Sequence, residues 1–372
     1  MFSFNIDSVI YFYMFICVAL LVFNVFYILR SQGKNRMMEK RVQYWKEMIG
    51  NALSSMEKED SVSKEHSVML ERKLRRIDQL MAYHEALLPQ IGNDTTRKYL
   101  DELHDTFQIL AAGYAGRPAM ERAFFAYVMS IYHPSSGREH DQLVELLLDF
   151  IRDATVYCRE NVLQAIYVMG SSAAIESAFR LLSDEGIYHN SRLLSDGLMK
   201  FSGNKEELAW RLWNQRLQWS ESIQIAIVQF ATQTSDAFEA VFLKALWEPA
   251  TTAEVRFAMI RYFQRHVYKE ALPFFLSRAM DADQSGDGLA IPACAALASY
   301  PGEETIYALK HAIHSRNWYV RKNAAASLVE LHAEEDCLKE LKASPDRYAE
   351  EMLIYMMELK RPKGRSVNDY RS

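Results

Sequence analysis

The chain has 372 residues, of which 49% are hydrophobic and 24% are charged, and it contains only 14 Gly and 9 Pro. This length allows one large or two ordinary domains, and the scarcity of turn formers, with Ala, Leu and Met at least as prominent as Val and Ile, predicts an all-α protein. Four widely spaced cysteines give neither a disulfide framework nor a zinc signature, and a net charge of −5 gives no general reason to expect nucleic acid as a partner.

Residues 9–29, VIYFYMFICVALLVFNVFYIL, form an uncharged segment whose only strongly polar side chain is Asn24. A helix of this length spans roughly 31 Å, which matches a hydrocarbon core of about 30 Å. A cleaved signal peptide would need basic residues before a shorter apolar stretch, and here Asp7 precedes the segment without any Lys or Arg. We therefore predict an uncleaved transmembrane helix over residues 9–29, with the lipid bilayer as its partner.

Basic side chains follow this segment and do not precede it. Within about 20 residues after it stand Arg30, Lys34, Arg36, Lys40, Arg41 and Lys46. Because positively charged flanks remain on the cytoplasmic side, we predict a single-pass protein of the cell membrane. Its short N-terminus, residues 1–8, is expected outside, and the C-terminal part in the cytoplasm.

Residues 30–92 are rich in charge and helix formers, which predicts a charged helical stalk. Apolar side chains recur at spacings of four and three on either side of a polar stretch: Met38, Val42, Trp45, Ile49, Ala52 and Met56, then Leu70, Leu74, Ile77, Met81, His84 and Leu88. This spacing is typical of a short coiled coil that makes a homodimer, and also of a stalk that packs on the neighbouring domain. Pro89 ends the pattern, and Asn93 or Asp94 is placed to cap the next helix.

Residues 93–360 contain a repeated pattern of helices joined by short polar turns. The segments 156–166, 253–263 and 319–329 (VYCRENVLQAI, AEVRFAMIRYF and YVRKNAAASLV) align on an arginine. When the helices between them are aligned as well, an anchor residue recurs about every 32 residues: Arg159, Arg192, Gln224, Arg256, Ala290 and Arg321. An earlier unit is anchored at Arg122.

Four residues before the anchor, several units carry a side chain suited to capping a helix: Thr155, Ser220, Thr252 and Asn317. A second helix follows each anchor helix, and no such pair covers its own apolar face. We therefore predict that neighbouring pairs stack into a continuous core, as an α-solenoid does.

This pattern resembles the HEAT-repeat family, including the short HEAT-like repeats of bacteria, over roughly residues 115–345. The residues that carry the resemblance are Val255 with Arg256, Val320 with Arg321, the small face of Ala324 and Ala325 with Leu328, and ALP at 271–273. The arginine is missing at Gln224 and Ala290. The resemblance implies a curved right-handed solenoid of about seven helix pairs, whose second helices and loops bind a partner protein. The resemblance also suggests that the partner is a membrane complex, such as an envelope glycosyltransferase system, but no particular residue indicates this.

Candidate chemistry is sparse. His311 and His314 lie three apart on a helix, close enough to share a metal, but no acidic third ligand follows and HExxH is absent. The loop 281–288, DADQSGDG, begins like an EF-hand, yet its twelfth position is Pro292 instead of a bidentate Glu. Surface histidines and a polar turn between repeats are the alternatives. We predict no catalytic residue, no metal site and no cofactor.

A partner-binding patch is the remaining candidate site. Trp210, Arg211, Trp213 and Arg216 combine the aromatic and arginine side chains that interface hot spots favour. The alternative is that these tryptophans belong to the core between helices. Residues 361–372 are expected to form a basic disordered tail, either solvated or in contact with anionic lipid headgroups.

We therefore predict a membrane-anchored cytoplasmic scaffold or adaptor, and not an enzyme. Two alternatives belong to other classes. One is a HEAT-fold enzyme, such as a bilin lyase or a DNA glycosylase, although an acidic chain tied to a membrane does not suit a glycosylase. The other is a structural or sensory module that dimerises through the stalk.

Overall fold

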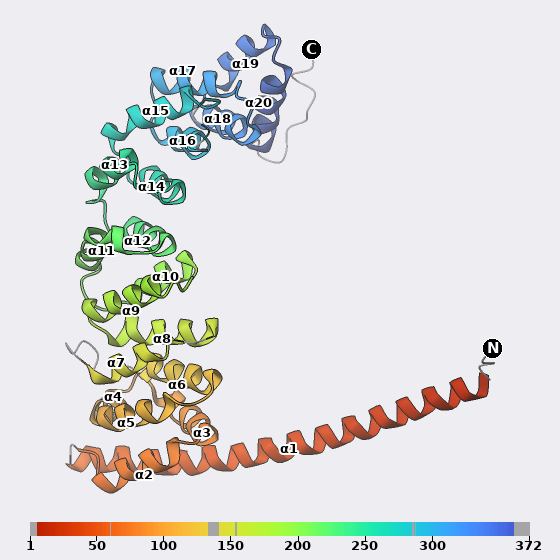
Figure 1. The fold of residues 1–372 in the computed structure, drawn as a ribbon, viewed down its shortest axis with the longest axis vertical. Helices are drawn as coiled ribbons and strands as arrows, with labels where there is room; N and C mark the ends of the chain where they lie inside the picture. Colours follow the sequence, from red (N-terminus) through yellow and green to blue (C-terminus); the bar gives the residue numbers. More distant parts are fainter. Residues whose placement is uncertain are drawn as a thin grey trace. The chain divides into compact units, whose positions relative to one another are not determined.

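In the computed structural model the described residues are 6–59, 61–132, 141–152, 155–284, 286 and 288–360. They form 20 α-helices and four short 3-10 helices and contain no strand, which confirms the predicted all-α class (Figure 1). The chain divides into two compact units, Met1–Ala178 and Phe179–Ser372. The predicted basic tail, residues 361–372, lies outside the described residues.

The first unit contains α1 (Ile6–Glu59), α2 (Lys64–Leu74), α3 (Ile77–Leu87), α4 (Asp94–Glu102), α5 (His104–Tyr114), α6 (Ala119–Tyr132), α7 (Gln142–Asp149) and α8 (Val156–Met169). Helix α9 (Ser172–Asp184) contains the boundary between the units. The second unit continues with α10 (Ser191–Leu198), α11 (Lys205–Asn214), α12 (Glu221–Thr234), α13 (Glu239–Trp247), α14 (Ala253–Arg265), α15 (Leu272–Met280), α16 (Ala290–Ala296), α17 (Glu303–Ala312), α18 (Trp318–Glu330), α19 (Glu334–Lys342) and α20 (Arg347–Lys360). The 3-10 helices are Leu88–Gln90, Arg216–Gln218, Lys269–Ala271 and Leu297–Ser299.

The first half of α1 is long and apolar enough, by length and composition, to cross a membrane. An 18-residue stretch in it has a mean hydropathy of 2.5, and none of that stretch is buried against other helices. In Figure 1 this half extends away from the other helices of the first unit. The one strongly polar side chain is satisfied locally, because Asn24 Nδ2 donates to the Leu20 carbonyl oxygen at 2.8 Å.

The second half of α1 packs on α3 and α4 of its own chain. Its buried side chains are Val42, Trp45, Ile49, Leu53 and Met56. Trp45 Nε1 donates to Gln79 Oε1 at 3.0 Å, and the Trp45 ring meets the Tyr83 ring edge-on with centroids 5.2 Å apart. Most of the predicted apolar stripe of residues 38–56 is therefore buried within this unit, and its members Met38 and Ala52 are half-buried.

The second predicted stripe does not lie on a single helix. Helix α2 ends at Leu74 and α3 begins at Ile77, with Arg76 in an extended conformation (φ −95°, ψ 126°) between them. Because the helix restarts after this turn, its buried face is shifted: Met81 and Leu88 are exposed, whereas Leu80, Tyr83 and Leu87 are buried. The predicted stalk is thus three helices that share a compact unit with α4–α8.

Helices in both units pack on the next helix but one. In the first unit α6 packs on α8, and in the second unit α10, α12, α14, α16 and α18 each pack on the following even-numbered helix. The helices between them, such as α11, α13 and α17, pack on their neighbours in sequence. An apolar face that one pair leaves open is thereby covered by the next pair.

The same hydrogen bond recurs between successive even-numbered helices. Asn161 Nδ2 donates to the Ala123 carbonyl oxygen at 2.9 Å, and Asn323 Nδ2 donates to the Ile291 carbonyl oxygen at 2.8 Å. Each asparagine stands two residues after an anchor, and each acceptor stands one residue after the preceding anchor. This repetition supports the register in which Arg122 precedes Arg159 and Ala290 precedes Arg321.

Candidate functional site

Three of the anchor arginines share one environment. Arg122, Arg256 and Arg321 are half-buried, and their Nε atoms are buried without a hydrogen-bond partner among the described residues. Arg256 Nη2 donates to the Glu248 carbonyl oxygen at 2.7 Å, and the Arg321 guanidinium lies 5.5 Å from the centroid of the Tyr348 ring. Arg159 is half-buried as well. The Arg256 and Arg321 side chains thus each contact a residue outside their own helix.

Arg192 does not belong to this set. Its side chain is 86% exposed and forms only a loose pair with Asp196, at 3.8 Å. Helix α10 is capped by Asn190, so Arg192 is its second residue, whereas Arg256 and Arg321 stand four residues after their caps. The residue four after Asn190 is Leu194, which is fully buried. Leu194, and not Arg192, therefore matches Arg256 and Arg321 in its distance from the helix cap, and the anchor role of Arg192 stays a prediction.

The predicted tryptophan and arginine patch is mostly interior. Trp213 is 2% exposed and meets Phe242 edge-on at 4.7 Å, and the half-buried Trp210 stacks on Phe238 at 4.2 Å. Arg216 lies 4.9 Å above the Trp213 ring and pairs with Glu248 at 2.9 Å. The core alternative therefore describes Trp213, while Arg211 is exposed and both Trp210 and Arg216 are partly exposed.

The two motifs considered for metal binding lie together in one pocket of about 420 Å³ in the second unit. Asp283 accepts hydrogen bonds from Ser315 Oγ at 2.6 Å and from the Arg316 amide at 3.1 Å, while His314 Nδ1 lies 2.7 Å from Asp346 Oδ2. Ser285 and Asp287 of the loop lie outside the described residues. In the described part of the chain no three His, Cys, Asp or Glu side chains gather closely enough to hold a metal ion.

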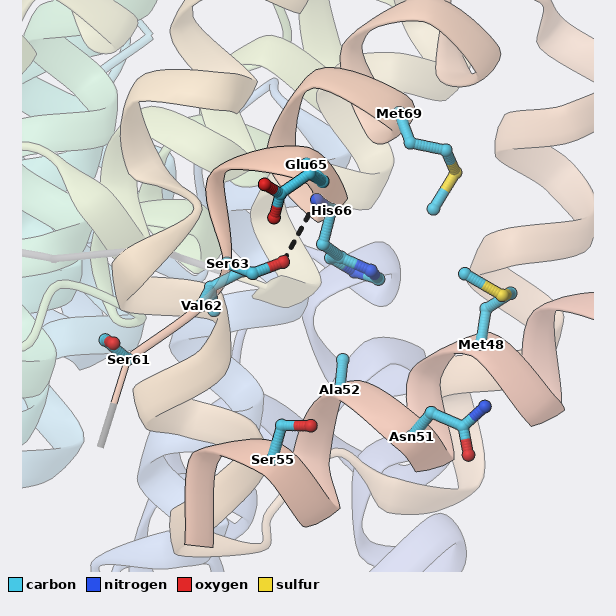
Figure 2. Close-up of a pocket in the computed structure, with 10 residues that line it drawn as sticks. All are labelled: Met48, Asn51, Ala52, Ser55, Ser61, Val62, Ser63, Glu65, His66 and Met69. Atoms are coloured by element: carbon cyan, nitrogen blue, oxygen red, sulfur yellow. Dashed lines mark hydrogen bonds between the residues drawn. The ribbon is translucent and has the colours of Figure 1, made fainter. Parts of the chain in front are cut away.

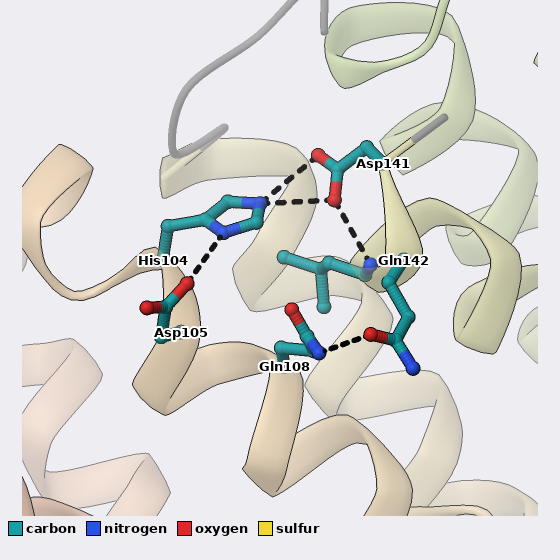
Figure 3. Close-up of polar contacts among 6 residues, drawn as sticks. His104, Asp105, Gln108, Asp141 and Gln142 are labelled. Carbon is teal, nitrogen blue, oxygen red and sulfur yellow. Dashed lines mark hydrogen bonds and ion pairs between the residues drawn. The ribbon is translucent and has the colours of Figure 1, made fainter. Parts of the chain in front are cut away.

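The buried pair of His104 and Asp141 was not predicted from the sequence. His104 Nε2 lies 2.9 Å from Asp141 Oδ1, which also accepts from the Leu143 amide at 2.9 Å as the cap of α7 (Figure 3). The other ring nitrogen lies 3.5 Å from Asp105 Oδ1. In a catalytic triad one ring nitrogen of the histidine faces a nucleophile, but here both ring nitrogens face carboxylates. The arrangement therefore suits a structural link between α5 and α7 better than a general base. The one signal in the sequence is an Asp directly before the apolar run of α7.

A second cavity, of about 430 Å³, lies between α1 and the start of α2 (Figure 2). Figure 2 shows the thioethers of Met48 and Met69 and the imidazole of His66 lining it. His66 Nε2 lies 2.9 Å from Tyr99 Oη, and Tyr83 Oη donates to Tyr99 Oη at 3.1 Å. Burial lowers the pKa of His66 and raises the pKa of both phenols, so this network is uncharged at neutral pH.

The buried cysteines are not activated nucleophiles. Burial raises the pKa of the Cys294 thiol to about 12 and that of Cys337 to about 11, and it also raises the pKa of Cys158. A thiol attacks only as its thiolate, so at neutral pH these side chains act as small core residues.

An open groove of about 530 Å³ lies between α15 and α17 in the second unit. It is lined by Leu276, Met280, Glu303, Glu304, Tyr307 and Ala308. Four of these side chains are apolar or aromatic and two are carboxylates, which makes this groove different from the closed contacts described above.

Comparisons of the chain with protein-family models, with curated proteins and with solved structures find no match. The likeness to HEAT repeats therefore depends on the residues and contacts of this chain alone.

Proposed function

We propose that this protein is a membrane-anchored scaffold or adaptor, whose HEAT-like helix pairs bind a partner protein on the cytoplasmic side. The observation that supports this best is the packing of each even-numbered helix on the next in the second unit. Stacked helix pairs of this kind expose their second helices and loops along one continuous surface, which is where such proteins bind partners.

The apolar half of α1 supports the membrane part of the proposal, since an uncovered apolar stretch of that length needs a bilayer. The basic residues that follow it favour the cytoplasm for the C-terminal part. Tethering at a membrane raises the effective concentration of a binding surface near other membrane proteins. An adaptor gains affinity in this way without additional contacts.

The stalk gives no support to the alternative of a dimerising sensory module. Its first apolar stripe, including Trp45 and Ile49, is buried against α3 and α4 of the same chain. A coiled-coil partner would need that same face.

The test is affinity purification of the full chain from membranes with a mild detergent, followed by quantitative mass spectrometry. One variant combines Leu217→Ser, directly after second helix α11, with Tyr307→Ser on second helix α17; both residues are exposed. Its matched control combines Tyr157→Ser and Tyr319→Ser, at exposed positions of first helices α8 and α18. We expect a defined partner to be lost from the first variant at least tenfold more than from the control. Equal recovery with both variants would show that the second-helix surface does not bind the partner.

A further inference from the structure

The groove between α15 and α17 has an apolar floor. Leu276 and Met280 stand one turn apart on α15 and are half-buried, and Tyr307 on α17 is 67% exposed beside them. A tyrosine this exposed, next to two partly covered aliphatic side chains, forms a place where another apolar side chain can be buried.

The carboxylates at one end of this groove are uncompensated. Glu303 and Glu304 begin α17, are exposed, and make no ion pair or hydrogen bond with any side chain that the structure describes. The lysine on the same helix is already paired, since Lys310 Nζ lies 2.7 Å from Glu340 Oε1. The groove therefore combines an apolar floor with two free negative charges.

Acidic residues also recur at the beginning of four other second helices, though not of α9. They are Glu206 and Glu207 in α11, Glu239 in α13, Glu270 before α15, and Glu334, Glu335 and Asp336 in α19. Acidic residues suit the first turn of any helix, because the helix dipole is positive there. Some lie close enough to repel one another, since the pKa of Glu239 is raised by burial and then by Asp236 and Glu270.

We propose that this groove binds the basic juxtamembrane segment of another membrane protein, with an apolar side chain of that segment on the floor and its Lys or Arg residues at Glu303 and Glu304. The inference rests on the proposed function. Segments on the cytoplasmic side of transmembrane helices carry an excess of Lys and Arg, so a tethered cytoplasmic scaffold meets such segments at high local concentration. Charge complementarity of this kind sets both partner choice and association rate.

The test uses the full chain in nanodiscs of phosphatidylcholine, which carries no net charge, and two labelled peptides of 16 residues. One peptide contains Leu, Lys and Arg in a helical pattern, and the other has Glu in place of every Lys and Arg. Fluorescence anisotropy, with empty nanodiscs subtracted, gives Kd at two salt concentrations. We expect the basic peptide to bind and its affinity to fall as salt rises, while the acidic peptide does not bind.

Variants locate the binding. Glu303→Gln with Glu304→Gln should weaken binding of the basic peptide about fivefold, from about 0.5 kcal/mol for each exposed pair, and Tyr307→Ser should also weaken it. The matched control, Glu254→Gln with Glu358→Gln, makes the same charge change at exposed positions outside the groove and should change Kd less than twofold. Equal effects of the two charge variants, or equal binding of the two peptides, would refute the inference.

The chain's own basic segment, residues 361–372, is the competing occupant. If a chain lacking these residues binds the basic peptide much more tightly, the groove belongs to that segment and not to a partner. Failure of the basic-segment inference can be told apart from failure of the proposed scaffold function. If a partner is lost with Leu217→Ser and Tyr307→Ser but retained with Glu303→Gln and Glu304→Gln, the scaffold function stands and the basic-segment inference fails.

Discussion

Arg192 and Arg256 occupy equivalent places in the repeat pattern of the sequence, yet the Arg256 side chain is half-buried and the Arg192 side chain is exposed. The Arg256 guanidinium donates to a backbone carbonyl, whereas Arg192 points into solvent. The sequence contains the distinguishing signal four residues before each arginine. A capping residue, Thr252, stands there for Arg256, and Tyr188 stands there for Arg192. The phase of a helix is set by its cap, so aligning caps places the buried face better than aligning arginines.

Replacing these two arginines should have very different consequences. Arg256→Ala removes a charged hydrogen bond and the packing of a partly buried stem, and should lower the free energy of unfolding by about 2 kcal/mol. Arg192→Ala should change it by less than about 0.5 kcal/mol, as is usual for exposed positions. Hydrogen exchange of the full chain in micelles, followed over α10–α16, measures both. A loss for Arg192→Ala as large as for Arg256→Ala would support Arg192 as an anchor.

The caps show what a sequence can and cannot reveal about single residues. Asn93, Thr155 and Asn317 cap their helices as predicted, each accepting a hydrogen bond from an amide in the first turn. Ser220 and Thr252 stand at cap positions without making that bond. Helix starts follow from residue type, but the bond itself depends on a side-chain rotamer that neighbouring packing selects.

At the scale of helices, the stripe on α1 shows why heptad spacing leaves its partner undecided. A coiled coil and a packed helix both need apolar side chains at spacings of three and four. What decides between them is a contact far along the chain, such as Trp45 with Gln79 and Tyr83. The break between α2 and α3 was equally hidden, because no Gly or Pro marks the turn at Arg75 and Arg76.

Helix α2 is fastened to α4 by an uncharged histidine, which makes its attachment sensitive to pH. Burial lowers the pKa of His66 below its usual value of about 6.5. The unfolded chain therefore binds a proton before the folded chain does as the pH falls. The stabilising contribution of neutral His66 is complete above about pH 6.5 and is lost as the pH falls from there through the lower pKa of the folded state.

We therefore expect the first unit to lose stability between pH 7.5 and pH 5, and His66→Gln, which cannot titrate, to lose less. Protection of α2 amides against hydrogen exchange, measured at each pH and corrected for the intrinsic rate, checks this. His311→Gln, at an exposed position in the second unit, is the control and should follow the wild type. An identical pH dependence for His66→Gln and wild type would mean that His66 does not control the attachment of α2.

For the whole molecule, the scarcity of turn formers and the prominence of Ala, Leu and Met were enough to predict the all-α class that the described residues show, while the repeat of about 32 residues stays a prediction. The contacts divide the chain after Ala178, a boundary that the sequence does not mark, and the separate parts 30–92 and 93–360 stay a prediction. The reason is physical: α1–α3 bury Trp45, Leu74 and Tyr83 in the same core as the helices that follow, and such tertiary contacts leave no local mark in the sequence.

If the apolar half of α1 anchors the protein in a membrane, as proposed, its removal should change location and not folding, which gives the last prediction. From Tyr11 to Ile28 the large side chains are exposed apart from Ile16, which is partly exposed, so removing residues 1–30 takes away no buried side chain of the described residues. The shortened chain should leave the membrane fraction and appear in the soluble fraction, because no other described helix is both long and apolar enough to span a bilayer. Its unfolding midpoint, followed by circular dichroism, should match that of the full chain in micelles within about 2 °C.

Two results would contradict the expectation that the apolar half does not pack on the fold. A midpoint lowered by 5 °C or more, about 2 kcal/mol for a unit of this size, would show that this half contributes to folding stability. Retention of the shortened chain on membranes that resists high salt would require a second apolar contact with lipid, since purely electrostatic attachment is screened. In that case the scaffold surface would itself face the bilayer, and the groove between α15 and α17 would need to be tested as a lipid site.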